Sequence, residues 1–271
     1  MDERLAENRA NWDDRVPIHW GGYDAEGFIA NPARISDVVR YDSPVLGDVS
    51  GQSLIHLQCH FGMDTLSWAR LGANVTGVDF SAEAIAAASR LSERSGTPGR
   101  FVEADVYDAA HVLDHQFDIV YTGVGAICWI PDIAGWARVV VALLKPGGRF
   151  YMREGHPVLW SLDWETAGPL VVRFPYFEIP DSVRFDDADA TYLGEGTLAH
   201  TTTHEWNHGI AETYTALVDA GLEVTSMREH RELEWQGLPT MTLHDDGLWR
   251  LPNHQRDLVP LMWTITATKP T

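Results

Sequence analysis

The chain has 271 residues, of which 45% are hydrophobic and 22% are charged, and its formal net charge is −19. This length and apolar content favour one large α/β domain with insertions over two independent domains. The negative charge argues against nucleic-acid and anionic-membrane partners, which require a basic surface, so we expect a small-molecule partner.

Several features indicate the compartment. The charged N-terminal sequence does not resemble a signal peptide, and no apolar stretch is long enough to span a bilayer. Cys59 and Cys128 are too few for a disulfide framework, and we expect both to be small core residues without a nucleophilic role. We therefore predict a cytoplasmic protein that is a monomer or a homodimer.

Residues 1–50 are predicted to form an N-terminal helical cap: a helix, then a polar and aromatic segment. This segment carries Trp12, Arg15 and Tyr23. If it folds over a bound cofactor, these residues supply a stacking face, a partner for a carboxylate and a hydroxyl. Ordinary packing of an amphipathic helix explains them equally well.

A strand–helix–strand pattern follows the cap. An apolar run (53–58) ends in a tight turn at Gly62, an amphipathic helix (64–71) follows, and a second apolar run (74–79) ends in Asp79. This is a βαβ unit with an acid at the tip of its second strand. Such an acid can bind both hydroxyls of a ribose, while the turn holds the rest of a nucleoside cofactor. The chain is therefore predicted to bind an adenosine-containing molecule.

The alternation of strands and helices continues to about residue 153. Further strands are expected at 99–103, 117–122 and 148–153, and helices at 82–95, 107–113 and 133–144. This order implies a parallel sheet with right-handed crossovers. A helix at 203–220 and two strands, at 223–228 and 261–268, are expected to close the chain.

Residues 157–203 break this rhythm with four prolines and seven aromatic residues, including Trp160, Phe174, Tyr176 and Phe177. We interpret them as a lid of short strands and loops whose aromatic side chains face a pocket for a hydrophobic or aromatic acceptor. A surface excursion with its own small cluster is the alternative. Insertions at the carboxyl ends of strands commonly shape substrate pockets, which favours the lid.

The ordered motifs resemble those of class I S-adenosylmethionine-dependent methyltransferases, over roughly residues 50–155 and 203–269. The family's first motif has an acid and three alternating glycines. Here His56 replaces the acid, Gln58 and His60 replace two glycines, and only Gly62 remains. The later motifs match in order and read Gly77-Val-Asp79-Phe-Ser81, Glu103-Ala-Asp105-Val, Phe117-Asp-Ile-Val-Tyr-Thr122 and Leu143-Leu-Lys-Pro-Gly-Gly148.

The resemblance implies a methyltransferase domain at 51–271 with a Rossmann-like α/β fold. Its seven-stranded sheet is mostly parallel and ends in an antiparallel hairpin. The implied cofactor is S-adenosylmethionine, with Asp79 on the ribose and Asp105 on the adenine amine. The other residues expected to line the cofactor pocket are Gln58, Cys59, His60, Gly62, Asp64, Phe80, Val106 and Thr122.

Two alternatives stay open: a nicotinamide-dependent Rossmann oxidoreductase, and a non-catalytic cofactor-binding or interaction protein of the same fold. The oxidoreductase fits less well because glycine is missing at Gln58 and His60, where a pyrophosphate must approach backbone amides. S-adenosylmethionine has no phosphate and tolerates bulkier residues there.

Methyl transfer is an in-line displacement, so the protein mainly aligns an oxygen, nitrogen or carbon nucleophile with the methyl group and excludes water. The tips of the first, fourth and fifth strands are neighbours in this fold. They make His156 and Glu154 the best acid/base candidates, although packing of His156 under the lid is an equally good explanation.

We expect the acceptor to contact Trp129, Trp160, Trp206 and His208.

One further cluster raises the question of a metal. His204 and His208 are one helical turn apart, with Glu205 and Glu212 nearby. However, Thr202-x-x-Glu205 also reads as a helix capping box, and the polar residues read as one solvated helix face. A third ligand at matching spacing is not evident, so we expect no metal.

Overall fold

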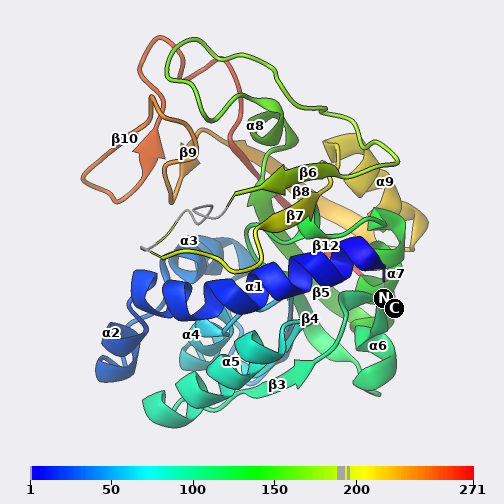
Figure 1. Ribbon diagram of the computed structural model, residues 1–271. Helices are drawn as coiled ribbons and strands as arrows, with labels where there is room; N and C mark the ends of the chain where they lie inside the picture. Colours follow the sequence, from blue (N-terminus) through cyan, green and yellow to red (C-terminus); the bar gives the residue numbers. More distant parts are fainter. Residues whose placement is uncertain (1, 188–192, 194–195) are drawn as a thin grey trace.

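The computed structural model describes residues 2–187, 193 and 196–271, so Tyr192 of the expected lid lies outside it. The centre of the described part is a seven-stranded sheet in the order β3-β2-β1-β4-β5-β12-β8 (Figure 1). Its strands are β1 (Ser53–Leu57), β2 (Asn74–Asp79), β3 (Arg100–Glu103), β4 (Phe117–Thr122), β5 (Leu144–Gly155), β8 (Glu223–His230) and β12 (Met262–Thr268). β1 to β5 are parallel, whereas β12 is antiparallel to β5 and β8. The predicted fold class is confirmed.

Helices cover both faces of this sheet, so β1 and β4 are apolar on both sides. On one face, helices α3 and α4 pack against Leu54 and Ile119. On the other, helices α7 and α9 pack against Ile55 and Val120. Apart from α8 (Pro157–Ser161), the helices that follow the first strand in the described residues are α4 (Met63–Arg70), α5 (Ala82–Ser95), α6 (Ala109–Val112), α7 (Ile133–Leu143) and α9 (Ile210–Asp219), with 3₁₀ turns η1 (Val106–Asp108) and η2 (Ile127–Trp129).

Three helices precede the sheet: α1 (Glu3–Gly22), α2 (Ala25–Ala30) and α3 (Asp37–Leu46). α1 runs through the segment that was expected to follow a shorter helix, and it lies between β7 and α5 (Figure 1). The side chain of Asn8, on α1, exchanges two hydrogen bonds with the backbone of His204, on β7, both at 2.7 Å. A boundary between cap and domain near residue 50 stays a prediction.

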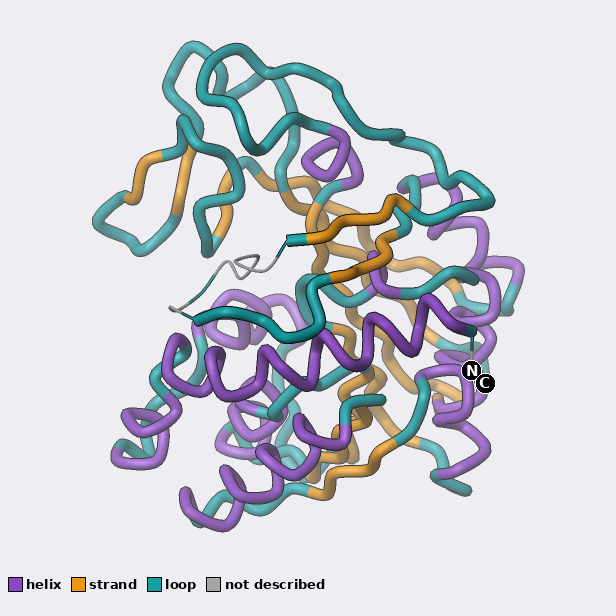
Figure 2. Tube along the Cα trace, viewed as in Figure 1, coloured by secondary structure: helices purple, strands orange, loops and turns teal. Residues whose placement is uncertain are grey.

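The segment expected as a lid is mainly loop (Figure 2). It holds α8 (Pro157–Ser161) and the antiparallel pair β6 (Val183–Asp186) and β7 (Thr202–Glu205). A second small sheet, which lies between the two closing strands in the sequence, consists of β9 (Glu232–Leu233), β10 (Thr242–Leu243) and β11 (Trp249–Arg250). Leu159 and Leu162 of the first segment share a buried cluster with Leu233 and Leu251 of the second, so the two pack as one unit.

The expected helix at 203–220 is wrong in its first part, because the helix begins at Ile210. Residues Thr202–Glu205 form a strand instead, whose β-branched threonines suit the pairing with β6. The helix is capped by Glu212, which accepts a hydrogen bond from the backbone N–H of Gly209 at 3.2 Å. The expected helix at 107–113 is divided into η1 and α6.

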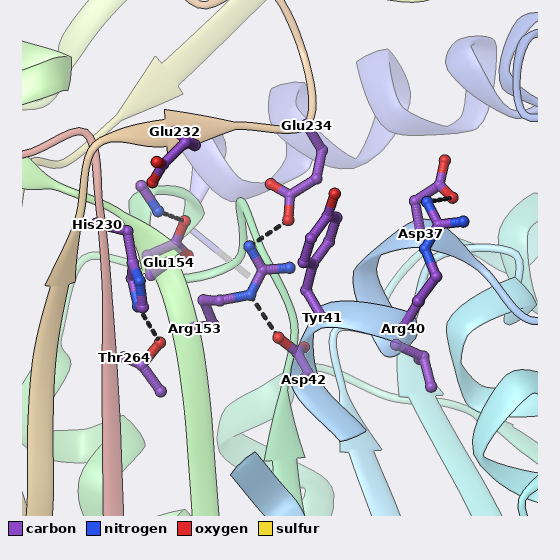
Figure 3. A network of polar contacts seen from close by, with 12 residues as sticks. Asp37, Arg40, Tyr41, Asp42, Arg153, Glu154, His230, Glu232, Glu234 and Thr264 are labelled. Atoms are coloured by element: carbon purple, nitrogen blue, oxygen red, sulfur yellow. Dashed lines mark hydrogen bonds and ion pairs between the residues drawn. The ribbon is translucent and has the colours of Figure 1, made fainter. Parts of the chain in front are cut away.

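A buried polar network joins α3 to the sheet (Figure 3). The Asp42 carboxylate accepts hydrogen bonds from the hydroxyls of Tyr121 (2.5 Å) and Tyr151 (2.8 Å) and from Arg153. Arg153 also pairs with Glu234, beyond β9. Although burial opposes it, Asp42 and Glu234 raise the pKa of Arg153, so the guanidinium stays charged. The network therefore fixes three segments that are distant in the sequence.

We expect Asp42→Ala to lower the free energy of unfolding by about 3–5 kcal/mol, because it leaves a buried guanidinium with one partner fewer. Urea denaturation measures this change. Asp37→Ala, in the same helix but with an exposed Arg40 partner, is the control and should cost below about 1 kcal/mol. Equal losses in both variants would contradict a special role for the network.

Candidate functional site

The turn after β1 has an unusual backbone. Gln58 and His60 adopt positive φ angles of 57° and 48°, and Gly62 has a φ of 76°. The left-handed region costs a non-glycine residue roughly 1–2 kcal/mol. Local bonds hold the turn: the Gln58 amide donates to the Ala126 carbonyl at 2.7 Å, and the His60 N–H donates to Asp79 at 2.8 Å. Such strain commonly persists at binding sites.

Asp79 lies at the tip of β2, as predicted, and is 6% exposed. Its carboxylate accepts the backbone N–H groups of His60 and Ser81. Burial raises the pKa of Asp79 to about 6, although these two hydrogen bonds oppose the rise. Each oxygen keeps a further lone pair, so the group can accept more hydrogen bonds. Phe80 is the next residue along the chain.

The neighbouring tips carry the remaining residues expected to bind a cofactor. Asp105 caps η1 by accepting the Tyr107 N–H at 3.0 Å, and Val106 is buried beside it. Thr122 ends β4, and its hydroxyl oxygen is buried without a hydrogen-bond partner among the described residues. The side-chain oxygen of Gln58 is likewise buried without a hydrogen-bond partner among the described residues. Since buried polar atoms normally have partners, these two oxygens suit a ligand.

α1 covers the same edge of the sheet with aromatic side chains. The ring of Trp12 lies 5.1 Å from the ring of His60 and 5.2 Å from that of Trp129. Arg15 lies over Trp12, and Tyr23 contacts the ring of His19 at 5.6 Å. The structure therefore places the three residues predicted on the cap against the turn after β1.

Asp64 and Cys59 were also expected to line the cofactor pocket, but Asp64 bonds to another part of the fold and Cys59 is chemically unreactive. The Asp64 carboxyl is hydrogen-bonded to Ser36 at the start of α3, and burial raises its pKa to about 6. Cys59 is buried in the turn after β1, and burial raises the pKa of its thiol, so it stays protonated.

Glu154 does not have the catalytic geometry that the sequence suggested. Its carboxylate, 1% exposed, accepts the backbone N–H groups of Gly125, Ala126 and Gly155 at 2.7 Å and of Ile127 at 3.1 Å. These bonds use both oxygens. Burial raises the pKa of Glu154, and the amides oppose the rise. Glu154 therefore shapes the loop after β4.

His156 also faces away from the expected site. Its Nδ1 accepts the Val158 N–H at 3.1 Å and so caps α8, while Nε2 lies 3.1 Å from a Glu229 oxygen on β8. β8 is an edge strand of the sheet, and β4, β5 and β12 separate it from β1. Burial lowers the pKa of His156, although Glu229 opposes this. The packing explanation holds for this side chain.

A cleft bordered by aromatic residues lies beside η2, and we call it the aromatic cleft. Its lining residues are Cys128, Trp160, Trp164, Phe174, Pro175, Val183, Phe185, Glu205, Trp206 and Asn207. It thus includes Trp160 and Trp206, two of the predicted acceptor contacts. Tyr176 and Phe177 do not line it, and Phe177 is 79% exposed.

The other two predicted acceptor contacts lie at its margins. Trp129 ends η2 and contacts Trp12 and Arg15. His208 is buried behind η2, where its Nε2 lies 2.8 Å from the carbonyl oxygen of Ile130.

Glu205 is the residue that sequence reasoning missed. A helix capping box was expected around it, but it lies on β7 and lines the aromatic cleft. Burial raises the pKa of Glu205 to about 7, with the charge of Arg15 opposing the rise. A carboxyl with a pKa near neutrality at the edge of a pocket is suited to acid–base chemistry. Its sequence signal was slight: the adjacent Trp206 is the one aromatic residue in an otherwise polar stretch.

Comparisons with known proteins indicate a methyltransferase domain. Residues 55–150 match the sequence model of a family described as a methyltransferase domain. A ubiquinone biosynthesis O-methyltransferase from Sodalis glossinidius is 29% identical over 156 residues, which are 55% of this chain and 60% of that protein. The chain therefore spans about three fifths of the length of this curated relative.

Solved structures show the same fold. An S-adenosylmethionine-dependent methyltransferase from Mesorhizobium loti has a TM-score of 0.56 at 19% identity, covering 84% of this chain and 97% of that one. The glycopeptide N-methyltransferase MtfA, complexed with S-adenosylmethionine, has a TM-score of 0.53 at 19% identity, covering 92% and 94%.

Residues 55–150 therefore match a methyltransferase domain, and the likeness of the longer chain to solved S-adenosylmethionine-dependent methyltransferases is a likeness of fold.

Two of the non-glycine residues with positive φ, Gln58 and His60, occupy the positions of two motif glycines. Gln58 and His60 therefore keep the backbone shape of the motif although the residue type has changed. Gly62 has no substitute, because a Cβ there would lie 2.5 Å from the ring of Phe101. His56, at the position of the motif acid, is buried and bonds Thr65 at 2.9 Å.

No helix in the described part of the chain combines the length and apolarity that a bilayer crossing requires.

Glu154→Gln should destabilise the protein by about 1–3 kcal/mol, because the new amide group places an N–H donor against buried backbone N–H donors. The free energy of unfolding in urea measures the loss. Glu93→Gln, on the exposed side of α5, is the matched control and should change it little. A catalytic carboxylate without a structural role would leave the stability unchanged.

Proposed function

We propose that this chain transfers the methyl group of S-adenosylmethionine to a small-molecule acceptor. One observation carries the proposal: the tips of β1, β2 and β4 bring Asp79 and the unpartnered oxygens of Gln58 and Thr122 to one edge of the sheet, beside the aromatic cleft. The O- and N-methyltransferases among the similar proteins support it.

The residues at this edge fit S-adenosylmethionine, which supplies an activated methyl group when bound. Asp79 would hold the ribose hydroxyls and Asp105 the adenine amine. The buried oxygens of Gln58 and Thr122 offer acceptors for its ammonium group. Trp12 of α1 would shield the bound cofactor from water, since it contacts the ring of His60 in the turn after β1.

The acceptor would enter the aromatic cleft. Trp160, Phe174 and Trp206 favour a flat, apolar or aromatic molecule. Glu205 would hold or remove the proton of its nucleophilic oxygen or nitrogen, because the side chain borders the cleft and titrates near neutrality. This assignment replaces His156 and Glu154. A cytoplasmic location and a monomeric or dimeric state stay predictions.

Asp79→Ala should weaken binding of S-adenosylhomocysteine by ~1.5–3 kcal/mol, the scale of charge-assisted hydrogen bonds. Calorimetry measures this, with NAD as the comparison ligand. Because the pKa of Asp79 is about 6 and the carboxylate is the accepting form, affinity should also fall as the pH drops below that value. Asp105→Ala should act in the same direction but more weakly.

Glu103→Gln is the control for this experiment, because this exposed acid at the tip of β3 pairs with Arg9. It should leave the affinity nearly unchanged. Equal affinity of wild type and Asp79→Ala, or tight binding of NAD, would contradict the assigned cofactor.

Glu205→Gln should lower turnover by ~10²–10⁴-fold, the range for a lost general base. The base must be deprotonated to act, so wild-type turnover should rise as the pH passes about 7, and the variant should lack this rise. Formation of S-adenosylhomocysteine is measured with aromatic phenols and amines as acceptors. Glu165→Gln, an exposed acid of the same segment, should behave as wild type. An unchanged profile in Glu205→Gln would exclude Glu205 as the base.

A further inference from the structure

The two ring nitrogens of His208 differ: Nε2 has a hydrogen-bond partner, whereas Nδ1 has none among the described residues. Nε2 lies 2.8 Å from the carbonyl oxygen of Ile130, and a carbonyl can only accept, so Nε2 carries the hydrogen. In the neutral ring, Nδ1 then presents a lone pair. The side chain is 0% exposed, and Nδ1 has no partner in hydrogen-bond geometry among the described residues. A buried lone pair of this kind normally meets a hydrogen-bond donor or a metal ion.

Two carboxylates face this nitrogen. A Glu178 oxygen lies 2.8 Å from Nδ1, and a Glu212 oxygen lies 3.9 Å from it. One ligand atom of each of the three residues lies within 4.8 Å of the others. Three electron-pair donors thus converge on one point.

We propose that Glu178, His208 and Glu212 bind a divalent transition-metal cation of the Zn²⁺ type. One imidazole and two carboxylates are a ligand set that suits Zn²⁺, at ~2.0–2.2 Å from each donor atom. Small side-chain shifts bring the three observed atoms to that distance. The Nε2–H bond to the Ile130 carbonyl fixes the ring in the way that metal-binding histidines usually require.

The cation would join three parts of the fold. Glu178 lies in the loop between α8 and β6, His208 and Glu212 lie at the start of α9, and Ile130 follows η2. The chain after α8 passes close to α9 before it turns back into β6 (Figures 1 and 2). A bound cation therefore would clamp the wall of the aromatic cleft, since Phe174 and Pro175 precede Glu178 in that loop. This role is independent of methyl transfer.

Chelator-treated full-length protein tests the proposal. Zn²⁺ is titrated in by calorimetry, the metal content is measured after desalting, and thermal unfolding is followed with and without metal. We expect one Zn²⁺ per chain and a higher melting temperature, because a ligand of the folded state stabilises it. Mg²⁺ should bind far more weakly, since it prefers oxygen ligands and retains water.

Matched variants locate the site. Glu178→Gln and Glu212→Gln should each weaken Zn²⁺ binding on the order of 10–100-fold or more, and should reduce the thermal stabilisation. Glu7→Gln is the control, because Glu7 pairs with His204 at 2.6 Å without belonging to the three-residue group. Glutamine substitutions spare the His208–Ile130 bond and so keep the fold.

Absent Zn²⁺ binding, or binding that Glu178→Gln and Glu212→Gln leave unchanged, would overturn the proposal. The contact would then be an ion pair between a protonated His208 and Glu178. Binding of S-adenosylhomocysteine, measured in the same variants, separates this outcome from a failure of the proposed methyltransferase function.

Discussion

The loop between β4 and α7 organises the site, and the buried carboxylate of Glu154 holds this loop in place. The carbonyl oxygens of the loop point outward to the other parts of the protein. Ala126 accepts the side chain of Gln58, Cys128 accepts the backbone N–H of Trp206, and Ile130 accepts His208. One set of charge-assisted hydrogen bonds therefore positions the turn after β1, the strand β7 and the start of α9.

This arrangement explains how bulky residues replace two motif glycines. The turn needs left-handed backbone at Gln58 and His60, and glycine would supply it without strain. In this chain the strain is offset by the Gln58 bond to the loop and by packing of the His60 ring against Trp12 and His19. The same side chains fill the edge of the sheet. The altered motif thus links the turn after β1 to helix α1.

The cap and the strand β7 form one structural unit around this edge. Asn8 pairs with the backbone of β7 at His204, and the side chain of Asn11 donates to the carbonyl of His200 at 2.7 Å. Asp13 accepts the hydroxyl of Ser81 at the tip of β2. α1 therefore contacts both the tip of β2 and strand β7, so under the proposed function it would be a wall shared by the cofactor and acceptor sites.

The sequence by itself determined the order of strands and the acids at their tips. Apolar runs and turn residues are local signals, so the βαβ unit ending in Asp79 and the terminal strands followed directly from the residues. The fixed geometry of a parallel sheet then placed Asp79 and Asp105 at one edge.

Only the tertiary structure decided which acids are available for chemistry. Three of the four backbone N–H partners of Glu154 lie nearly thirty residues earlier, which no side-chain pattern reveals. Thr202–Glu205 became a strand because β6 pairs with it, and this moved Glu205 from a helix cap into the aromatic cleft. Likewise, Glu178 meets His208 only because the loop after α8 returns to α9. Contacts of this kind depend on pairing between distant segments, whereas periodicity and turn chemistry describe only neighbours along the chain.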